Sequence, residues 1–288
     1  MDIGVVSLAF CSAALFGLAL VLTQMGLQEL SPLRGACVSV PTTAVMFLAL
    51  SPFALDLATF DAMSALLFLL CGLAFPAAVT LLTFEANRRI GLHLTGSLGN
   101  LTPLFAIAVA FFVLDEAPRL GQLAGIAIIL TGVALLIGAP RASPAGAIGW
   151  GLALPFAAAL IRGVIQPVVK LGLETWPSPF AAALIGYLAS AAVILSVGAV
   201  YEGRSLASFE GRRWMLFLAV GACNGLAVLA MYAALTRGSV TVVAPLLACY
   251  PLATLAFSWL LLGKAGITWG ASVGVGLAVA GVAVLLRA

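Results

Sequence analysis

Charged residues are scarce in this chain. Asp, Glu, Lys and Arg make up 8% of its 288 residues, whereas soluble domains carry about 25%. Hydrophobic residues make up 64%, far more than one water-soluble core can bury. The composition therefore excludes an ordinary soluble domain and indicates a protein that crosses a lipid bilayer several times.

Several residue types are too few or too scattered for common functions. The 13 basic residues form no continuous patch, so nucleic-acid binding is not expected. The chain has one histidine and lacks the glycine-rich phosphate loop of ATP-driven pumps, so neither a metal, a cofactor nor primary transport is predicted. Its five cysteines are odd in number and lie in apolar runs, which predicts small buried side chains and no disulfides.

Long apolar runs fill most of the sequence. Because an α-helix needs roughly 20 residues to cross the hydrocarbon layer, we predict about ten membrane spans, an all-α fold. They are Gly4–Gln28, Pro32–Leu50, Ala62–Phe84, Leu92–Leu114, Leu120–Gly138, Trp150–Leu171, Phe180–Tyr201, Trp214–Leu235, Val240–Leu262 and Ile267–Leu286. Short polar connections are expected between them, including Asn87–Gly91. The first span follows Asp2 and no basic segment, so we expect it to be retained and not removed as a signal peptide.

The chain contains an internal repeat. An offset of 148 residues places Phe84–Ala86 on Tyr232–Ala234, Arg89 on Arg237, and Pro103 on Pro251. After one inserted residue, Gly121, Gly125 and Gly132 fall on Gly270, Gly274 and Gly281. At the front of each half, Gly17, Gly26 and Leu27 fall on Gly163, Gly172 and Leu173. The sequence therefore predicts two related five-helix units, residues 1–138 and 150–288, joined by a linker at 139–149.

An odd number of spans in each unit has a geometric consequence. The second unit must enter the membrane in the opposite orientation, which is the inverted-repeat plan of many secondary transporters. In that plan the substrate binds near the midplane between the units, in a cavity that opens alternately to each side. The sequence therefore predicts alternating access of a small-molecule substrate across the bilayer.

The pattern resembles a known family. Phe16–Gly17 and Gly26–Leu27 ahead of Ser31–Pro32, Pro103 in the fourth span, Asp115–Glu116 after it, and Gly125 and Gly132 in the fifth are similar to the EamA-type drug/metabolite transporter superfamily. Within it, the chain most resembles the YddG-like amino-acid exporters. The resemblance implies a monomeric, multi-pass inner-membrane exporter of amino acids, apolar and aromatic ones among them, and not an enzyme. It also has departures: Lys264 replaces the equivalent of Glu116, and Arg162–Gly163 stands where many members have Trp-Gly.

Arg162 is the main candidate for substrate binding. It lies near the middle of its span, roughly 16 Å from either end at 1.5 Å per residue, too deep to reach the surface. Because an intramembrane arginine is costly, it predicts a functional site. Gln166 follows one turn later on the same face. We predict that both contact a carboxylate or other polar group; the alternative is hydrogen bonding between helices. Lys170, one turn further, is expected to be an interfacial anchor.

A second polar stripe lies on the fourth span. His93, Ser97 and Asn100 share one helical face, and Ser97 and Asn100 are predicted to line the cavity. Pro103 and its equivalent Pro251 are predicted to kink their helices beside it, as paired hinges.

Aromatic and amide side chains complete the predicted site. A small amphiphilic ligand prefers an apolar wall with few polar groups. The candidates are Phe16, Phe75, Phe84, Asn224, Met231, Tyr232 and Tyr250. Trp150, Trp176, Trp214 and Trp269 lie at span ends and are expected to be interface anchors.

Other functions remain open at the level of sequence. No acidic residue lies in the middle of a span, which favours gradient-driven movement, with proton coupling left open. A multidrug or other metabolite exporter is the alternative within the same superfamily, and an intramembrane hydrolase using Ser97 and His93 is the alternative from another class. The count of basic residues places the termini outside the cell, whereas the family resemblance implies cytoplasmic termini.

Overall fold

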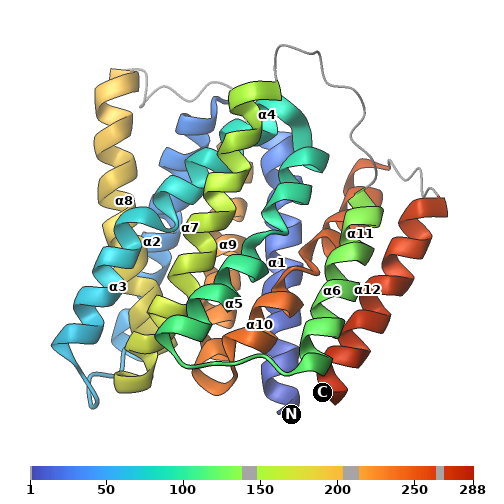
Figure 1. Ribbon diagram of the computed structural model, residues 1–288. Helices are drawn as coiled ribbons and strands as arrows, with labels where there is room; N and C mark the ends of the chain where they lie inside the picture. Colours follow the sequence, from blue (N-terminus) through green and yellow to red (C-terminus); the bar gives the residue numbers. More distant parts are fainter. Residues whose placement is uncertain (1, 138–147, 204–213, 264–268) are drawn as a thin grey trace.

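The computed structural model describes residues 2–137, 148–203, 214–263 and 269–288. This part of the chain is helical (Figure 1). Its helices are α1 (Ile3–Gly26), α2 (Pro32–Ala54), α3 (Ala62–Ala74), α4 (Ala77–Gly99), α5 (Thr102–Val113), α6 (Leu120–Ile137), α7 (Ile148–Thr175), α8 (Pro179–Glu202), α9 (Trp214–Arg237), α10 (Val240–Leu247), α11 (Tyr250–Leu262) and α12 (Trp269–Arg287).

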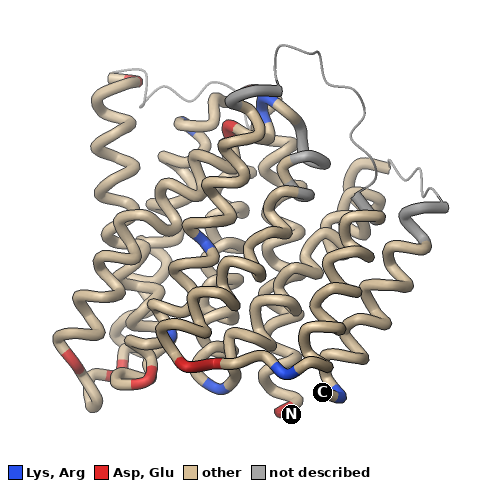
Figure 2. The backbone as a smooth tube through the Cα atoms, viewed as in Figure 1, with Lys and Arg blue, Asp and Glu red and all other residues tan. Residues whose placement is uncertain are grey.

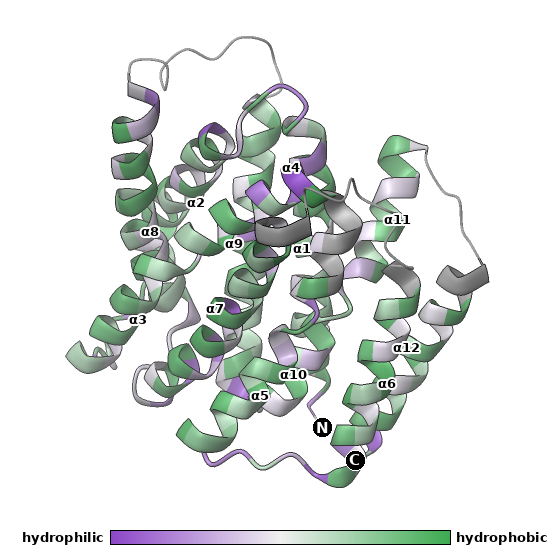
Figure 3. Cartoon of the chain, turned by 45° about the horizontal axis from the view of Figure 1, so that its top comes forward, coloured by the Kyte–Doolittle hydropathy of each residue, from purple (hydrophilic) through white to green (hydrophobic). Residues whose placement is uncertain are grey.

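The helices have the length and surface of a multi-pass membrane protein. Within the described residues, seven helical segments are long and apolar enough to cross a bilayer, and three shorter apolar helices accompany them. Large apolar side chains such as Phe53, Phe112 and Leu260 point outward, and hydrophobic colour dominates the bundle in Figure 3. Because such a surface is unfavourable in water, it indicates contact with lipid.

Most charged residues of the described chain lie at the ends of the bundle. Figure 2 shows the acidic and basic positions gathered at its two ends, apart from a basic position at mid-height on α7. Both termini lie at the lower end in Figure 1. At the upper end, Arg34 Nε pairs with Glu202 Oε2 at 2.7 Å, and Glu85 pairs with Arg88 and Arg89.

Three predicted spans are interrupted. The span expected at Ala62–Phe84 breaks at Phe75–Pro76, and α4 then continues as helix through the connection expected at Asn87–Gly91. The span expected at Leu92–Leu114 breaks between α4 and α5, and Val240–Leu262 breaks between α10 and α11. Proline explains the first break because it lacks the N–H that a continuing helix needs. Hydropathy does not show such breaks, because the residues around them are mostly apolar.

Pro103 and Pro251 are not kinks within continuous helices, contrary to the sequence prediction. Each lies in the first turn of the helix that follows a break, α5 or α11, where the missing N–H costs nothing. The two breaks have equivalent hydrogen bonds: Leu104 N donates to Leu101 O at 3.0 Å, and Leu252 N donates to Cys249 O at 2.9 Å.

Glycines of the repeat allow helices α6 and α12 to pack closely. A Cβ on Gly132 would lie 2.8 Å from Gly274 O, and a Cβ on Gly281 would lie 2.9 Å from Gly125 O. Gly125 aligns with Gly274 and Gly132 with Gly281, so each contact is the other with the two units exchanged. Small residues let membrane helices approach to backbone contact.

The same exchange relates contacts elsewhere in the bundle. Gly17 on α1 packs against residues 250–254 of α11, and its equivalent, Gly163 on α7, packs against residues 102–106 of α5. Thr43 on α2 donates to Gly221 O at 2.6 Å, and Ser190 on α8 donates to Gly72 O. The two glycine contacts connect the units through equivalent positions, and the two hydrogen bonds connect the units as well.

Two positions differ from the sequence prediction. Trp176, predicted to be an anchor at the membrane interface, is instead buried within the protein and is 1% exposed. It packs edge-on against Phe60, and its Nε1 donates to Asp56 O at 3.3 Å. Cys11, predicted to be buried, is exposed on α1. Both differences arise because lipid-facing and core-facing residues are equally apolar, so sequence alone does not separate them.

Candidate functional site

A cavity lies between the two units. Its walls come from α1, α4, α5, α7, α9, α10 and α11, with single residues of other segments. The principal lining residues are Phe16, Leu20, Thr23, Phe75, Pro76, Thr80, Thr83, Phe84, Thr95, Gly99, Thr102, Pro103, Pro155, Arg162, Gln166, Tyr187, Asn224, Val228, Met231, Leu247 and Tyr250.

The cavity extends from the middle of the bundle toward the end opposite the termini. On α1 it is lined by Phe16–Thr23, in the second half of that helix, and on α7 by Pro155–Gln166, which runs from the first half of that helix to just past its centre. Those halves point to the upper end in Figure 1, away from the termini.

Arg162 places a positive charge in this cavity. It lies near the centre of α7, roughly 20 Å from either end of that helix at 1.5 Å per residue. Its Nε is buried with no hydrogen-bond partner among the described residues. A buried donor without a partner costs free energy, so this N–H is available to a ligand that carries an acceptor.

Other polar atoms near Arg162 also lack partners. Gln166 is 2% exposed and its Oε1 accepts no hydrogen bond within the described chain. Thr95 and Thr102 have hydroxyls in the same condition. No aspartate or glutamate belongs to the described lining. The cavity therefore offers donors and acceptors with a net positive charge.

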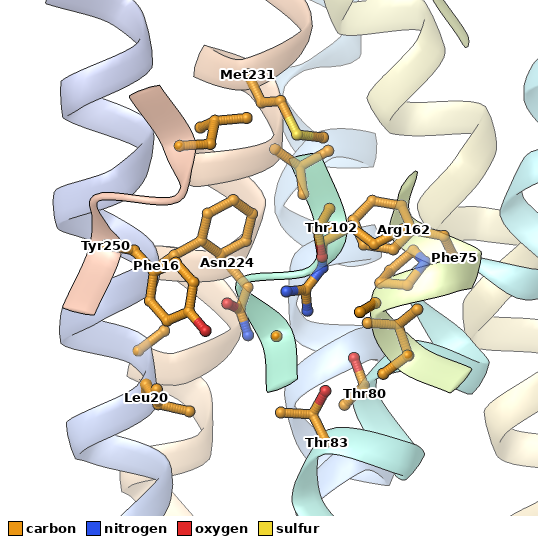
Figure 4. A pocket seen from close by; sticks show the side chains of 18 of the residues that line it. Phe16, Leu20, Phe75, Thr80, Thr83, Thr102, Arg162, Asn224, Met231 and Tyr250 are labelled. Atoms are coloured by element: carbon orange, nitrogen blue, oxygen red, sulfur yellow. The ribbon is translucent and has the colours of Figure 1, made fainter. Parts of the chain in front are cut away.

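Figure 4 shows how the labelled side chains meet. The Arg162 guanidinium reaches from α7 into the cavity near Thr102, while Asn224 and Tyr250 approach from the opposite side. Thr80 and Thr83 also point into the cavity. Tyr250 lies close to the end of α4, since a Cβ on Gly99 would be 2.7 Å from its hydroxyl oxygen.

Most of the predicted site residues line this cavity. They are Phe16, Phe75, Phe84, Pro103, Arg162, Gln166, Asn224, Met231 and Tyr250. The apolar ones come chiefly from the first unit, with Leu20 and Val79 beside them.

Other predicted residues do not line it. Tyr232 is 3% exposed and packs in the core, and Asn100 is 5% exposed beside the break before α5, where both amide atoms lack partners among the described residues. Pro251 is buried next to Tyr250 and is absent from the lining. Gly99 and Thr102 line the cavity, and Asn100, which lies between them in the sequence, does not. The side chains of Ser97 and His93 lie outside the described residues.

Sequence reasoning missed the threonines of the cavity. Thr23, Thr80, Thr83, Thr95 and Thr102 all line it. Thr80 and Thr83 are one helical turn apart, a spacing that places both hydroxyls on one face. That spacing is a usable signal, but threonine is also common between membrane helices as a hydrogen-bonding residue.

The end of the bundle near the termini is held by an ion pair. Lys170 Nζ lies 2.5 Å from Glu116 Oε1, and the two side chains are 14% and 15% exposed. Lys170 also donates to Gly238 O at 2.8 Å, and the N–H of Thr241 donates to Glu116 Oε2 at 3.2 Å. The sequence predicted that Lys170 is a lipid-interface anchor, and this prediction is wrong. Lys170 is part of a network that joins α7, the segment after α5, and the start of α10.

The described chain is thus a helical bundle with exchanged glycine contacts and a central cavity that contains Arg162. The model of the EamA-like transporter family matches the chain twice, over residues 3–138 and 149–287. The chain belongs to the EamA-like transporter family. It is therefore a multi-pass membrane transporter of the drug/metabolite transporter superfamily, a family of transporters and not of enzymes.

A solved structure has the same fold. The crystal structure of another protein superposes on this chain with a TM-score of 0.81 and is 18% identical in sequence. The match covers 99% of this chain and 96% of the other. At that identity the likeness concerns the fold alone. No curated protein matches the sequence.

Proposed function

We propose that the chain is a secondary transporter of the cell's inner membrane that exports small metabolites, amino acids among them, by alternating access. The observation that carries this proposal is Arg162, whose buried Nε has no partner in the described structure, in a central cavity whose described lining contains no acidic residue. The substrate supplies the missing negative group. The transporter acts as a monomer.

The proposed architecture is ten membrane crossings in two inverted five-helix repeats. The exchanged contacts of Gly17 and Gly163, and of Gly132 and Gly281, support it. Two units related in this way can exchange conformations, which moves the opening of the cavity from one side of the membrane to the other.

Closure at one end supports alternating access. The cavity extends away from the termini, and the Glu116–Lys170 pair connects three segments at the other end. For a substrate to leave at the end near the termini, this network has to open. The basic-residue count and the family resemblance disagree on the side of the membrane where the termini lie. Reporter fusions to either terminus decide whether that end is cytoplasmic.

Amino acids fit the chemistry of the cavity. A carboxylate accepts two parallel hydrogen bonds from a guanidinium, while an apolar side chain packs on Phe16, Phe75 or Met231. Lipophilic cations, the substrates of a multidrug exporter, would be repelled by Arg162 and meet no carboxylate in the described lining. The hydrolase alternative requires Ser97 and His93. Labelling of the chain by a covalent serine probe would support that alternative.

The test is flux in proteoliposomes that contain the purified full chain. Arg162→Ala is expected to reduce counterflow of radiolabelled leucine and phenylalanine by about tenfold or more, since hydrogen bonds to a charged group contribute about 1.5–3 kcal/mol. Arg162→Lys is expected to restore only part of the flux, because a point charge lacks the forked donors. Folded yield is measured by size-exclusion chromatography for each variant.

Arg89→Ala is the matched control, because this arginine is 52% exposed in its side chain and pairs with Glu85 at the end of the bundle. It is expected to leave the flux within about twofold, as exposed ion pairs contribute little. Unchanged amino-acid flux in Arg162→Ala would reduce Arg162 to a structural role and remove the basis for an anionic substrate.

A further inference from the structure

The two units contribute differently to the cavity, although their backbones make equivalent contacts. The alignment that places Gly17 on Gly163 also places Phe16 on Arg162 and Leu20 on Gln166. All four of these aligned side chains line the cavity. On α7 they are a cation and an amide; on α1 they are a phenyl ring and an isobutyl group.

The same difference holds for helices α9 and α11. Asn224 aligns with the Phe75–Pro76 break, where the first unit has no side-chain amide. Tyr250 aligns with Thr102, so a phenol in the second unit corresponds to a short hydroxyl in the first. These positions also line the cavity.

Aligned positions that are polar in the first unit and apolar in the second carry only neutral groups. Thr80 and Thr83 of the first unit align with Val228 and Met231 of the second, and all of these line the cavity. The first unit therefore adds neutral hydroxyls, whereas the charge and the side-chain amides come from α7 and α9. Arg162 Nε and Gln166 Oε1, which have no partner in the described structure, are both on α7.

We infer that the cavity holds its ligand in one orientation relative to the two repeats. The anionic group of the ligand lies against Arg162, a hydrogen-bond donor of the ligand faces Gln166 Oε1, and its apolar part lies against Phe16 and Leu20. The ligand class is an amphipathic zwitterion or a carboxylate with a nearby N–H. This inference rests on the proposed function and adds the direction in which the substrate sits.

The physical reason is that the guanidinium has no counterpart in the other repeat. A cavity with the same charge on both sides would bind a ligand in two orientations, related by exchange of the units. Here the flipped orientation places a carboxylate against Phe16 and Leu20 and leaves Arg162 facing an apolar group. Burying a carboxylate without a partner is far more costly than burying it beside a guanidinium, so one orientation dominates.

The test is ligand binding to the purified full chain in detergent, measured by calorimetry with four probes. They are phenylalanine, phenethylamine, which lacks the carboxylate, 3-phenylpropanoate, which lacks the ammonium group, and alanine, which lacks the ring. Phenylalanine is expected to bind the unmodified protein at least about tenfold more tightly than each of the others, because each loses one of the proposed contacts.

Each substitution is expected to remove the preference for one group only. Arg162→Gln reduces the preference for phenylalanine over phenethylamine to within about twofold. Phe16→Ala reduces the preference over alanine but keeps that over phenethylamine. Gln166→Leu reduces the preference over 3-phenylpropanoate, and adding Leu20→Gln in the same chain does not restore it, because the amide then lies at the wrong end of the ligand.

Two results would overturn the inference. One is that the substitutions weaken all probes by the same factor; the other is that Leu20→Gln restores the ammonium preference, which would mean that the ligand binds in either orientation. Binding without flux in proteoliposomes would reject the proposed transport and leave the orientation intact. Flux in proteoliposomes, together with substitutions that weaken all probes equally, would support the proposed transport and reject the orientation. Arg89→Gln, at a residue outside the described lining, controls for general loss of stability.

Discussion

The two repeats are alike where they touch each other and unlike where they face the cavity. Gly17 and Gly163 make equivalent backbone contacts, yet the residues just before them are Phe16 and Arg162. Helix packing tolerates only a very small residue at these contacts, whereas a cavity wall accepts many side chains. The repeats therefore share a scaffold and divide the chemistry between them.

The largest expected effect comes from breaking the shared scaffold at α6 and α12. A Cβ on Gly132 would lie 2.5 Å from Ala278 N, and one on Gly281 would lie 2.6 Å from Ile129 N. Gly132→Leu and Gly281→Leu are each expected to destabilise the protein by about 1–3 kcal/mol or more, because backbone atoms cannot move aside as a side chain can. Thermal unfolding in detergent, followed by size-exclusion chromatography, measures the loss.

Gly276→Leu is the control on α12, since no atom lies within 4 Å of a Cβ built there. It is expected to unfold within a few degrees of the unmodified protein. Equal losses at Gly276 and Gly281 would contradict the close-packing explanation.

A second substitution pair sharpens the equivalence of the repeats. A Cβ on Gly17 would lie 2.8 Å from Thr254 N, and one on Gly163 would lie 3.0 Å from Thr102 O. Gly17→Ala and Gly163→Ala are expected to lower the free energy of unfolding by similar amounts, about 1 kcal/mol or more each, and so to lower the unfolding temperature by similar amounts. A loss confined to one of the two would show that the scaffold is less symmetric than its contacts.

The smallest expected effect on stability concerns the asymmetric closure. Glu116 pairs with Lys170, while the aligned residue of the second repeat is Lys264, outside the described residues. Glu116→Gln keeps the shape but removes the charge, and is expected to cost about 1 kcal/mol. It is also expected to increase labelling by a membrane-impermeant maleimide at a cysteine introduced at Thr236, because the network at that end opens more often.

Glu85→Gln removes an exposed pair at the other end of the bundle and serves as its control. It is expected to leave the labelling unchanged. If both variants raised labelling equally, the effect would reflect general loosening and not a gate.

Much of the fold could be predicted from the sequence. The scarcity of charge and the apolar runs identify a helical membrane protein, because hydrocarbon accepts only chains that satisfy their own backbone hydrogen bonds. Gly125 and Gly132 of the first half have the same spacing as Gly274 and Gly281 of the second, and small residues in membrane helices favour close contacts. Arg162 is conspicuous for a related reason: charge inside a membrane is too costly to be incidental.

The tertiary structure alone decided which apolar and polar residues face the cavity. It interrupted three of the predicted spans, and it placed Gly99 and Thr102 in the cavity wall and left Asn100 out of it. It buried Tyr232 where Phe84, its repeat equivalent, lines the wall, and it paired Lys170 with Glu116. In a membrane protein, lipid and core are both apolar, so periodicity does not tell the inner face of a helix from the outer one. Only the packing of the helices against each other fixes that choice.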